Sequence, residues 1–379
     1  MLSQLAFLFV AMALATGRVV RRDSADGFPN PNATQLEFIE DVADGTLSDA
    51  PPRPSLNESS IPIFQLISFN ENFEVAFFSS LIENITTDEP GFTLPTEKKM
   101  EILETWRPSW LPPQQEQLHT IDASKVLKHF NASPIPDPCE YVFPGATDIN
   151  SSISLAATFT DVVLGTLQEA AERLAVNGDL GPIREVASII GQEGQQSGFY
   201  RLLLNQKPSQ KPFLTTNVGA FAWSALQQFV VSCPFKIGEI EIPIFPPLEV
   251  AHVTGGQTIE PRDQRLSFVA NLTCSSEAEQ FINETSPDLF VTYFSGQLLP
   301  ISLPVEDVEW FGENNAQLRF EAEFRFEENI LVGLTIAALT SKDNFTTYSE
   351  VVGATIAAPG LIEVTDEGLS WDLLSEEDL

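Results

Sequence analysis

The stretch PIFQLISFNENFEVAFFSSLIENI, residues 62–85, predicts a long α-helix, because its apolar residues recur with the helical period. A rotation of about 100° per residue places five of them on one face. These five are Phe69, Phe73, Ala76, Phe77 and Leu81. Glu74 falls on the flank of this face, and Glu71 is expected further out. The stretch therefore predicts a helix that carries a carboxylate beside its buried face.

A second helix is expected to begin at Pro112-Pro113, since proline is favoured in the first turn of a helix. Its apolar face consists of Ala123, Val126, Leu127 and Phe130. Glu116 and His119 fall within that face, and their spacing of three residues makes them neighbours on the helix surface. We therefore expect a carboxylate and an imidazole on the buried side of this helix.

Two more helices are expected over 150–176 and 182–205. Thr160 lies in the middle of the apolar face of the third helix, whereas Glu193 and Gln196 lie on the buried side of the fourth. A buried ionised carboxylate must be paired, protonated or bound to a metal, because an unpaired one costs several kcal/mol. A bundle that combines Glu from two helices with Glu-x-x-His from two others is the carboxylate-bridged dimetal arrangement. The helices therefore indicate this type of centre.

The pattern changes after a fifth helix expected over 217–230, because Gly and Pro become frequent and apolar residues begin to alternate with polar ones. The alternation is clearest over 318–326. Further strands are expected over 246–253, 264–274, 288–294 and 329–340. Strands at this spacing are typical of a β-sandwich. The predicted fold class is α+β with several domains: a four-helix bundle with a fifth helix, followed by a β-sandwich-like domain.

Five short motifs carry a resemblance to a known family. They are NENFEVAFF (70–78), EQLH (116–119), PCEYVFP (138–144), GQEGQQSGFYR (191–201) and FVVSCP (229–234). With these motifs, residues 61–235 resemble the ferritin-like domain of secreted fungal proteins linked to stress response and late sexual development, which are related to plant desiccation-associated proteins. Two motifs each contain a cysteine, so the resemblance implies a disulfide between Cys139 and Cys233. Cys274 is then left over.

The resemblance also implies metal ligands, although the chain departs from the dimetal pattern. Glu74, Glu116, His119 and Glu193 occupy ligand positions of that pattern. Thr160 stands where the third helix would carry Glu, and Gln196 stands where the fourth would carry His. Neither Thr nor Gln is a strong ligand for a transition metal. One half of the site is therefore expected to be complete and the other degenerate.

Three interpretations of this site remain open, ranked in the order given. In the first, no metal binds, and Glu193, Gln196, Thr160 and His119 form a buried hydrogen-bonded network. In the second, a single Fe, Mn or Zn ion binds without the oxygen chemistry of a metal pair. Its ligands would be Glu74, Glu116 and His119, with or without Glu193.

The third interpretation is a di-iron or dimanganese oxidoreductase or ferroxidase. It requires Asp161 or Glu71 as an additional ligand from the rim of a helix face. No other catalytic motif occurs, and neither His129 nor His252 has carboxylates at a suitable spacing. The sequence therefore leans away from an enzyme.

The N-terminus predicts secretion. An apolar run over 5–15 ends in Ala13-Leu14-Ala15 and matches a signal peptide, and Arg21-Arg22 matches a dibasic processing site. Eight Asn-x-Ser/Thr acceptors then predict a glycoprotein. They are Asn32, Asn57, Asn84, Asn131, Asn150, Asn271, Asn283 and Asn344. No stretch is apolar and long enough to predict a membrane span.

The charge of the chain excludes one class of partner. Its 53 acidic and 20 basic residues give a formal net charge of −33, which is incompatible with the basic surface that nucleic-acid binding requires. Five regions are expected: a signal peptide and pro-segment (1–22), a flexible leader (23–60), the helical domain (61–235), the β-rich domain (236–361) and an acidic tail (362–379). The predicted function is that of a secreted glycoprotein of stress response or sexual development. An alternative is a module that binds the cell wall or a ligand through its β domain.

Overall fold

The computed structural model describes residues 19–20, 26–50, 53–100, 102, 113–251, 258–274, 278, 281 and 289–365. The predicted signal peptide, the dibasic pair, His252, Asn283 and residues 366–379 lie outside the described residues. Within them the chain forms helices and mixed sheets, so the predicted α+β class is confirmed. In this part of the chain no helix is both long and apolar enough to cross a bilayer.

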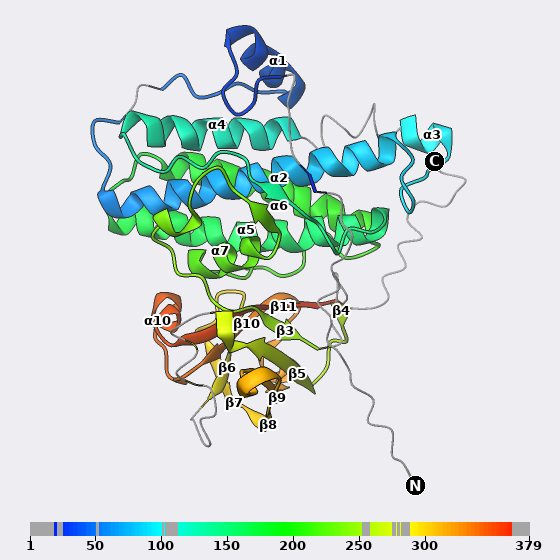
Figure 1. Ribbon diagram of the computed structural model, residues 1–379, viewed down its shortest axis with the longest axis vertical. Coiled ribbons are helices and arrows are strands. Elements are labelled where there is room, and N and C mark those ends of the chain that lie inside the picture. Colours follow the sequence, from blue (N-terminus) through cyan, green and yellow to red (C-terminus); the bar gives the residue numbers. More distant parts are fainter. Residues whose placement is uncertain are drawn as a thin grey trace.

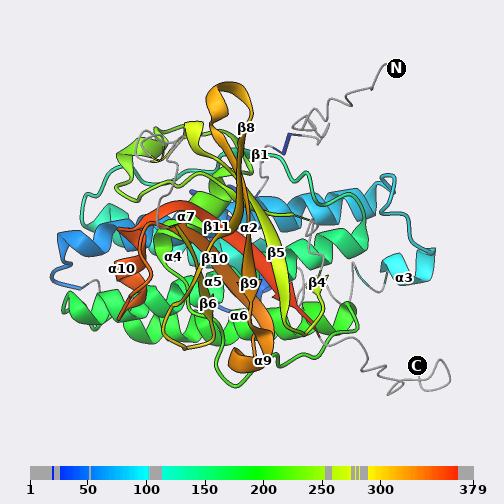
Figure 2. The same ribbon diagram turned by 90° about the horizontal axis from the view of Figure 1, so that it is seen from below.

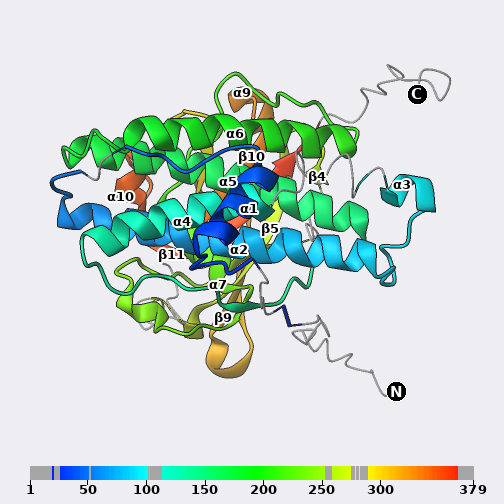
Figure 3. The ribbon, with the colours of Figure 1, turned by 90° about the horizontal axis from the view of Figure 1, so that it is seen from above.

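Four long helices form the helical unit, and each matches a predicted helix to within a few residues. They are α2 (Ile61–Thr86), α4 (Pro113–His129), α5 (Ile149–Val176) and α6 (Ile183–Leu203). They lie side by side in Figures 1 and 3, where α2 packs chiefly against α4 and α5 against α6. Asp148 caps α5, because its side chain accepts the backbone N–H of Ser151 at 2.8 Å. The helical unit is thus two helix pairs laid against each other.

Shorter helices and a two-stranded sheet complete this unit. They are α3 (Thr96–Met100), α7 (Gly219–Gln227), β1 (Glu140–Tyr141) and β2 (Val230–Ser232), with one 3₁₀ turn on each side, η1 (Glu58–Ser60) and η3 (Ile237–Glu239). The predicted fifth helix is α7. Strands β1 and β2 pair antiparallel beside a disulfide between Cys139 and Cys233. The predicted disulfide is therefore confirmed.

The segment expected to be a flexible leader, 23–60, contains regular structure in its described residues. It contains helix α1 (Ala33–Ala43), which lies across α4 in Figure 3 and buries Ile39. Its N-terminus is stabilised by a capping box between Asn32 and Gln35. Leu36, Ile39 and Ala43 recur at helical spacing, but the helix is only eleven residues long and lies between proline-containing segments, whose composition indicated a flexible segment.

Two sheets form the second unit (Figure 2). The first has the strand order β4-β11-β10-β6-β7, with β4 parallel to β11, and the second has the order β3-β5-β9-β8. The bounds are β3 (Leu248–Val250), β4 (Thr258–Ile259), β5 (Gln264–Asn271), β6 (Phe290–Ser295), β7 (Ile301–Pro304), β8 (Glu306–Phe311), β9 (Gln317–Phe324), β10 (Gly333–Thr340) and β11 (Thr355–Val364). Short helical turns connect some of them: η4 (Leu272–Cys274), η5 (Glu313–Asn315), α9 (Phe326–Asn329) and α10 (Tyr348–Val352). Phe268 and Phe320 of one sheet share a core with Val291 and Leu339 of the other.

All five predicted strands are found, as β3, β5, β6, β9 and β10. The strand β11 was missed, and it extends to Val364, so the prediction that the acidic tail begins at 362 is wrong. Strands β7 and β8 were also missed. Most of β8 is exposed, and a strand without a buried face shows no alternation of apolar residues.

The two units share a core where α5 and α7 meet β6, β10 and β11. Phe221 of α7 stacks on Phe294 of β6 with ring centroids 5.5 Å apart, and Val162 of α5 joins the same cluster. Arg201 of α6 lies 2.7 Å from the carboxylate of Glu363 on β11. The helices are therefore attached to the sheets by both apolar packing and an ion pair between the buried Arg201 and the half-buried Glu363.

Candidate metal centre

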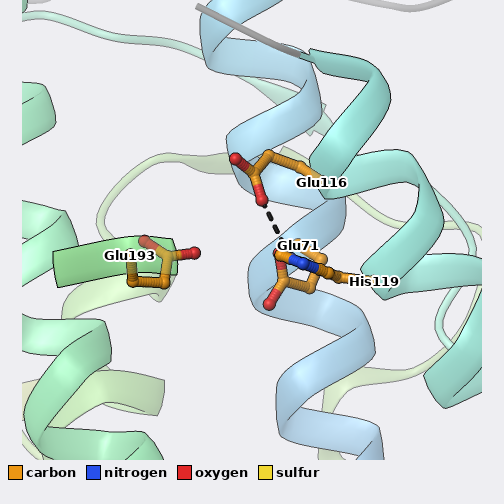
Figure 4. A group of neighbouring side chains, drawn as sticks. All are labelled: Glu71, Glu116, His119 and Glu193. Atoms are coloured by element: carbon orange, nitrogen blue, oxygen red, sulfur yellow. Dashed lines mark ion pairs between the residues drawn. The ribbon is translucent and has the colours of Figure 1, made fainter. Parts of the chain in front are cut away.

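Three helices bring four potential ligands to one point inside the helical unit. Glu71 comes from α2, Glu116 and His119 come from α4, and Glu193 comes from α6 (Figure 4). One ligand atom from each residue lies within 4.8 Å of all the others. Because the donors are three carboxylates and an imidazole, the set suits iron, manganese or zinc.

The cluster contains three of the predicted ligands, with Glu71 in place of Glu74. The expectation that Glu71 lies at the rim of its helix is wrong, because its exposed fraction is 0%. Every residue from 63 to 78 of α2 is buried, so this helix has no solvent face over that stretch. A helical wheel assumes one buried face, and it fails for a helix enclosed on all sides. The sequence pattern of α2 favours Glu74 over Glu71, so it could not identify Glu71 as a member of the cluster.

Glu74 is also fully buried, but it lies outside the group of four. Its Oε1 accepts the side-chain amide of Asn70 at 2.8 Å, and its Oε2 has no protein hydrogen-bond partner among the described residues. After burial, the charge of Glu74 is the largest influence that raises the pKa of Glu193. Glu74 is therefore an electrostatic neighbour of the cluster.

Most ligand atoms of the cluster lack a hydrogen bond. His119 Nδ1 lies 3.0 Å from Glu116 Oε2 and 3.4 Å from Glu71 Oε2, as ion-pair contacts. Within the described residues, neither oxygen of Glu193 has a protein hydrogen-bond partner, and neither has Oε1 of Glu71. Buried polar atoms are normally hydrogen-bonded, and leaving one unsatisfied costs roughly 1–3 kcal/mol. The cluster therefore contains several potential metal-ligand atoms that have no hydrogen bond from the protein.

The pKa values reflect this arrangement. Burial raises the pKa of Glu71 to about 7, against the weaker opposing effect of His119. Burial also raises the pKa of Glu193 well above its ordinary value, and neighbouring carboxylates raise it further. For His119 burial lowers the pKa, but Glu71 and Glu116 together outweigh burial, so the pKa lies well above the ordinary value. The cluster therefore retains protons that a bound cation would displace.

The predicted network of Glu193, Gln196, Thr160 and His119 is not formed. Thr160 is fully buried, yet its hydroxyl has no hydrogen-bond partner among the described residues. Gln196 instead donates its side-chain amide to Glu116 Oε1 at 2.7 Å. The first interpretation therefore lacks the hydrogen bonds on which it depends.

Asp161 does not serve as a replacement ligand, and that part of the third interpretation is wrong. Its carboxylate accepts hydrogen bonds from Ser197, at 2.8 Å, and from Gln210, and it lies 3.6 Å from Arg201. These contacts belong to the junction with the sheets. The ring of His129 packs against Phe130 with centroids 4.7 Å apart and takes no part in the cluster.

Most of the predicted glycosylation acceptors are accessible. Seven of the eight lie within the described residues, and none of the seven is buried. The exposed ones are Asn32, Asn57, Asn131, Asn150 and Asn344, whereas Asn84 and Asn271 are half-buried. Glycosylation itself remains a prediction.

Comparison with known proteins does not identify the chain. No family model matches its sequence, and no curated protein matches it. The resemblance to the ferritin-like family therefore remains a prediction, and functional conclusions depend on the cluster.

Proposed function

We propose that this chain is a metal-binding protein whose helical unit holds a divalent transition-metal ion through Glu71, Glu116, His119 and Glu193. One observation supports the proposal: four ligand atoms converge within 4.8 Å. Around them, both carboxylate oxygens of Glu193 and Oε1 of Glu71 lack protein hydrogen bonds among the described residues. Burying carboxylates together is unfavourable, because each loses its hydration and repels the others. A cation offsets both costs and completes the coordination of the unsatisfied oxygens.

The finer fold assignment follows from the same proposal. We infer that α2, α4, α5 and α6 correspond to a ferritin-like bundle, in which metal ligands project inward from facing helices. The support is the pairing of α2 with α4 and of α5 with α6, together with the Glu116-x-x-His119 pair. We also propose that the two sheets form a β-sandwich-like domain, since residues from both contribute to one core.

The biological setting is proposed on sequence features. The apolar N-terminal run, the dibasic pair and the eight acceptor asparagines favour a secreted glycoprotein. A disulfide is in keeping with an oxidising compartment. With the resemblance, these features favour a role in stress response or sexual development, in which the metal ion is bound without paired-metal oxidase chemistry.

Metal analysis of the purified full-length chain tests the proposal. We expect bound iron, manganese or zinc after purification without chelator, and saturable binding of Mn²⁺ or Zn²⁺ to chelator-treated protein by calorimetry. The double variant Glu116→Gln, His119→Ala should lose this binding, because it removes a carboxylate ligand and the single imidazole. Glu172→Gln, an exposed change on α5, serves as the control. A folded wild-type chain that binds none of these ions would contradict the proposal.

A further inference from the structure

Helices α4 and α6 each carry a glutamate followed three residues later by a polar side chain, and this second side chain differs between the two helices. On α4, Glu116 is followed three residues later by His119, and on α6, Glu193 is followed three residues later by Gln196. A spacing of three residues places both members of each pair on one helix face. The two helices therefore direct one imidazole and one amide toward the same region.

The amide of Gln196 has a fixed orientation. Its Nε2 donates to Glu116 Oε1 at 2.7 Å, and its Oε1 accepts the hydroxyl of Tyr200 at 3.3 Å. Both side chains are buried, with exposed fractions of 3% for Gln196 and 0% for Tyr200. Because a nitrogen of the amide is the donor to Glu116, the Gln196 oxygen faces Tyr200. Gln196 therefore presents no lone pair toward the carboxylates.

Oxygen donors for a second cation are nevertheless present. Glu74 Oε2, both oxygens of Glu193 and the hydroxyl of Thr160 are buried and have no hydrogen-bond partner among the described residues. The charge of Glu74 also raises the pKa of Glu193 more than the charges of Glu116 and Glu71 do. Glu74 Oε2 is therefore a carboxylate oxygen outside the first ligand set that a second cation could use.

The oxygen of Glu116 that is not directed at His119 is Oε1, and it already accepts the Gln196 amide. A carboxylate that bridges two cations must offer one oxygen to each. The hydrogen bond from Gln196 therefore competes with bridging by Glu116, while it holds Oε2 toward His119 and Glu71.

We propose that Gln196, held by Tyr200, restricts the centre to one cation and positions Glu116 as a ligand of that cation. This inference rests on the proposed function. Gln196 acts through Glu116 and is a positioning residue. Gln196 occupies the position that a metal ligand has in the two-metal pattern, and it acts there as a hydrogen-bond donor. The site therefore binds one metal ion instead of two.

The test is to restore a ligand at this place in the full chain. Gln196→His supplies an imidazole and Gln196→Glu supplies a nearly isosteric carboxylate, and both remove the amide donor. We expect Mn²⁺ bound per chain to rise from about one to about two in both variants. The electron paramagnetic resonance spectrum should change from that of isolated Mn²⁺ to that of a spin-coupled pair.

Gln192→His is the matched control, because Gln192 lies on the same helix and its side-chain amide donates to Gln115 at 2.9 Å instead of to a proposed ligand. It should leave the stoichiometry and the spectrum unchanged. The variant Gln196→Met tests positioning, since it removes the hydrogen bond and adds no ligand. We expect the affinity for the first Mn²⁺ to fall roughly tenfold, the equivalent of one charge-assisted hydrogen bond.

The outcomes separate this inference from the proposed function. A wild-type chain that binds no Mn²⁺ overturns the proposed function and the inference with it. A wild-type chain that binds two ions overturns the inference alone. The inference is also overturned if folded Gln196→His and Gln196→Glu proteins both remain at one ion with an unchanged spectrum, or if Gln192→His gains a second ion in the same way.

Discussion

Replacing Glu71 with glutamine tests whether the buried cluster is built for a cation rather than for stability. The pKa of Glu71 is about 7 and its ordinary value is 4.5. Since the folded-state pKa is raised, the folded chain binds this proton more tightly than the unfolded chain. The stability from this preference is fully present below about pH 4.5 and is lost as the pH rises through about 7. A shift of this size corresponds to about 3 kcal/mol, and Glu71 is fully buried.

Glutamine has nearly the shape of the protonated acid and carries no charge. In chelator-treated protein at pH 8, Glu71→Gln should therefore raise the free energy of unfolding by up to about 3 kcal/mol. At pH 4.5, where the wild-type carboxyl is protonated, the gain should vanish. Added Mn²⁺ should reverse the order at pH 8, because the wild type then gains the binding free energy and the variant has lost a ligand.

Urea unfolding followed by circular dichroism measures these differences at both pH values, with and without Mn²⁺. Glu172→Gln, an exposed change on α5, should move the free energy of unfolding little under any of these conditions. If Glu71→Gln destabilises the metal-free chain at pH 8, then the Glu71 carboxylate is satisfied by the protein and the reasoning for a cation is refuted.

Three further predictions concern the same structure. Metal affinity should fall as the pH drops below about 7, because a cation must displace the proton that Glu71 retains, and calorimetry in buffers of different ionisation enthalpy should detect proton release. Arg201→Met should lower the free energy of unfolding at pH 8 by about 3 kcal/mol, since it removes the cation that lies 2.7 Å from the half-buried Glu363 and 3.6 Å from the buried Asp161. Urea titration would show no change if these ion pairs were dispensable. Replacing both Cys139 and Cys233 with serine should cost about 2–4 kcal/mol, because the bond closes a loop with a sequence separation of 94, and thermal unfolding with and without reductant gives the comparison.

The helical part of the fold was readable because long helices with regular apolar spacing leave a strong periodic signal. The same reasoning assigned Glu116 and His119 correctly to one buried face, since their spacing fixes their relation whatever packs against them. The helical-wheel prediction is wrong for Glu71, because α2 is buried on all sides over 63–78 and has no solvent-exposed polar face from which a buried face could be distinguished. Strand β8, which lacks a buried face, was also missed. The spacing of apolar residues identifies the buried side chains only where a helix or strand has one solvent-exposed face.

Because the cluster lies between the two helix pairs, the proposed ion would affect how strongly the pairs are held together. Glu71, Glu116 and His119 belong to the pair α2 and α4, whereas Glu193 belongs to α6 of the other pair. The hydrogen bond from Gln196 to Glu116 crosses the same boundary. Without a cation, the carboxylates on the two sides repel each other once they ionise, which opposes the packing of the pairs. With the proposed cation, the same groups would be ligands shared across the boundary, so the charge arrangement that weakens the metal-free helical unit would hold the two helix pairs together.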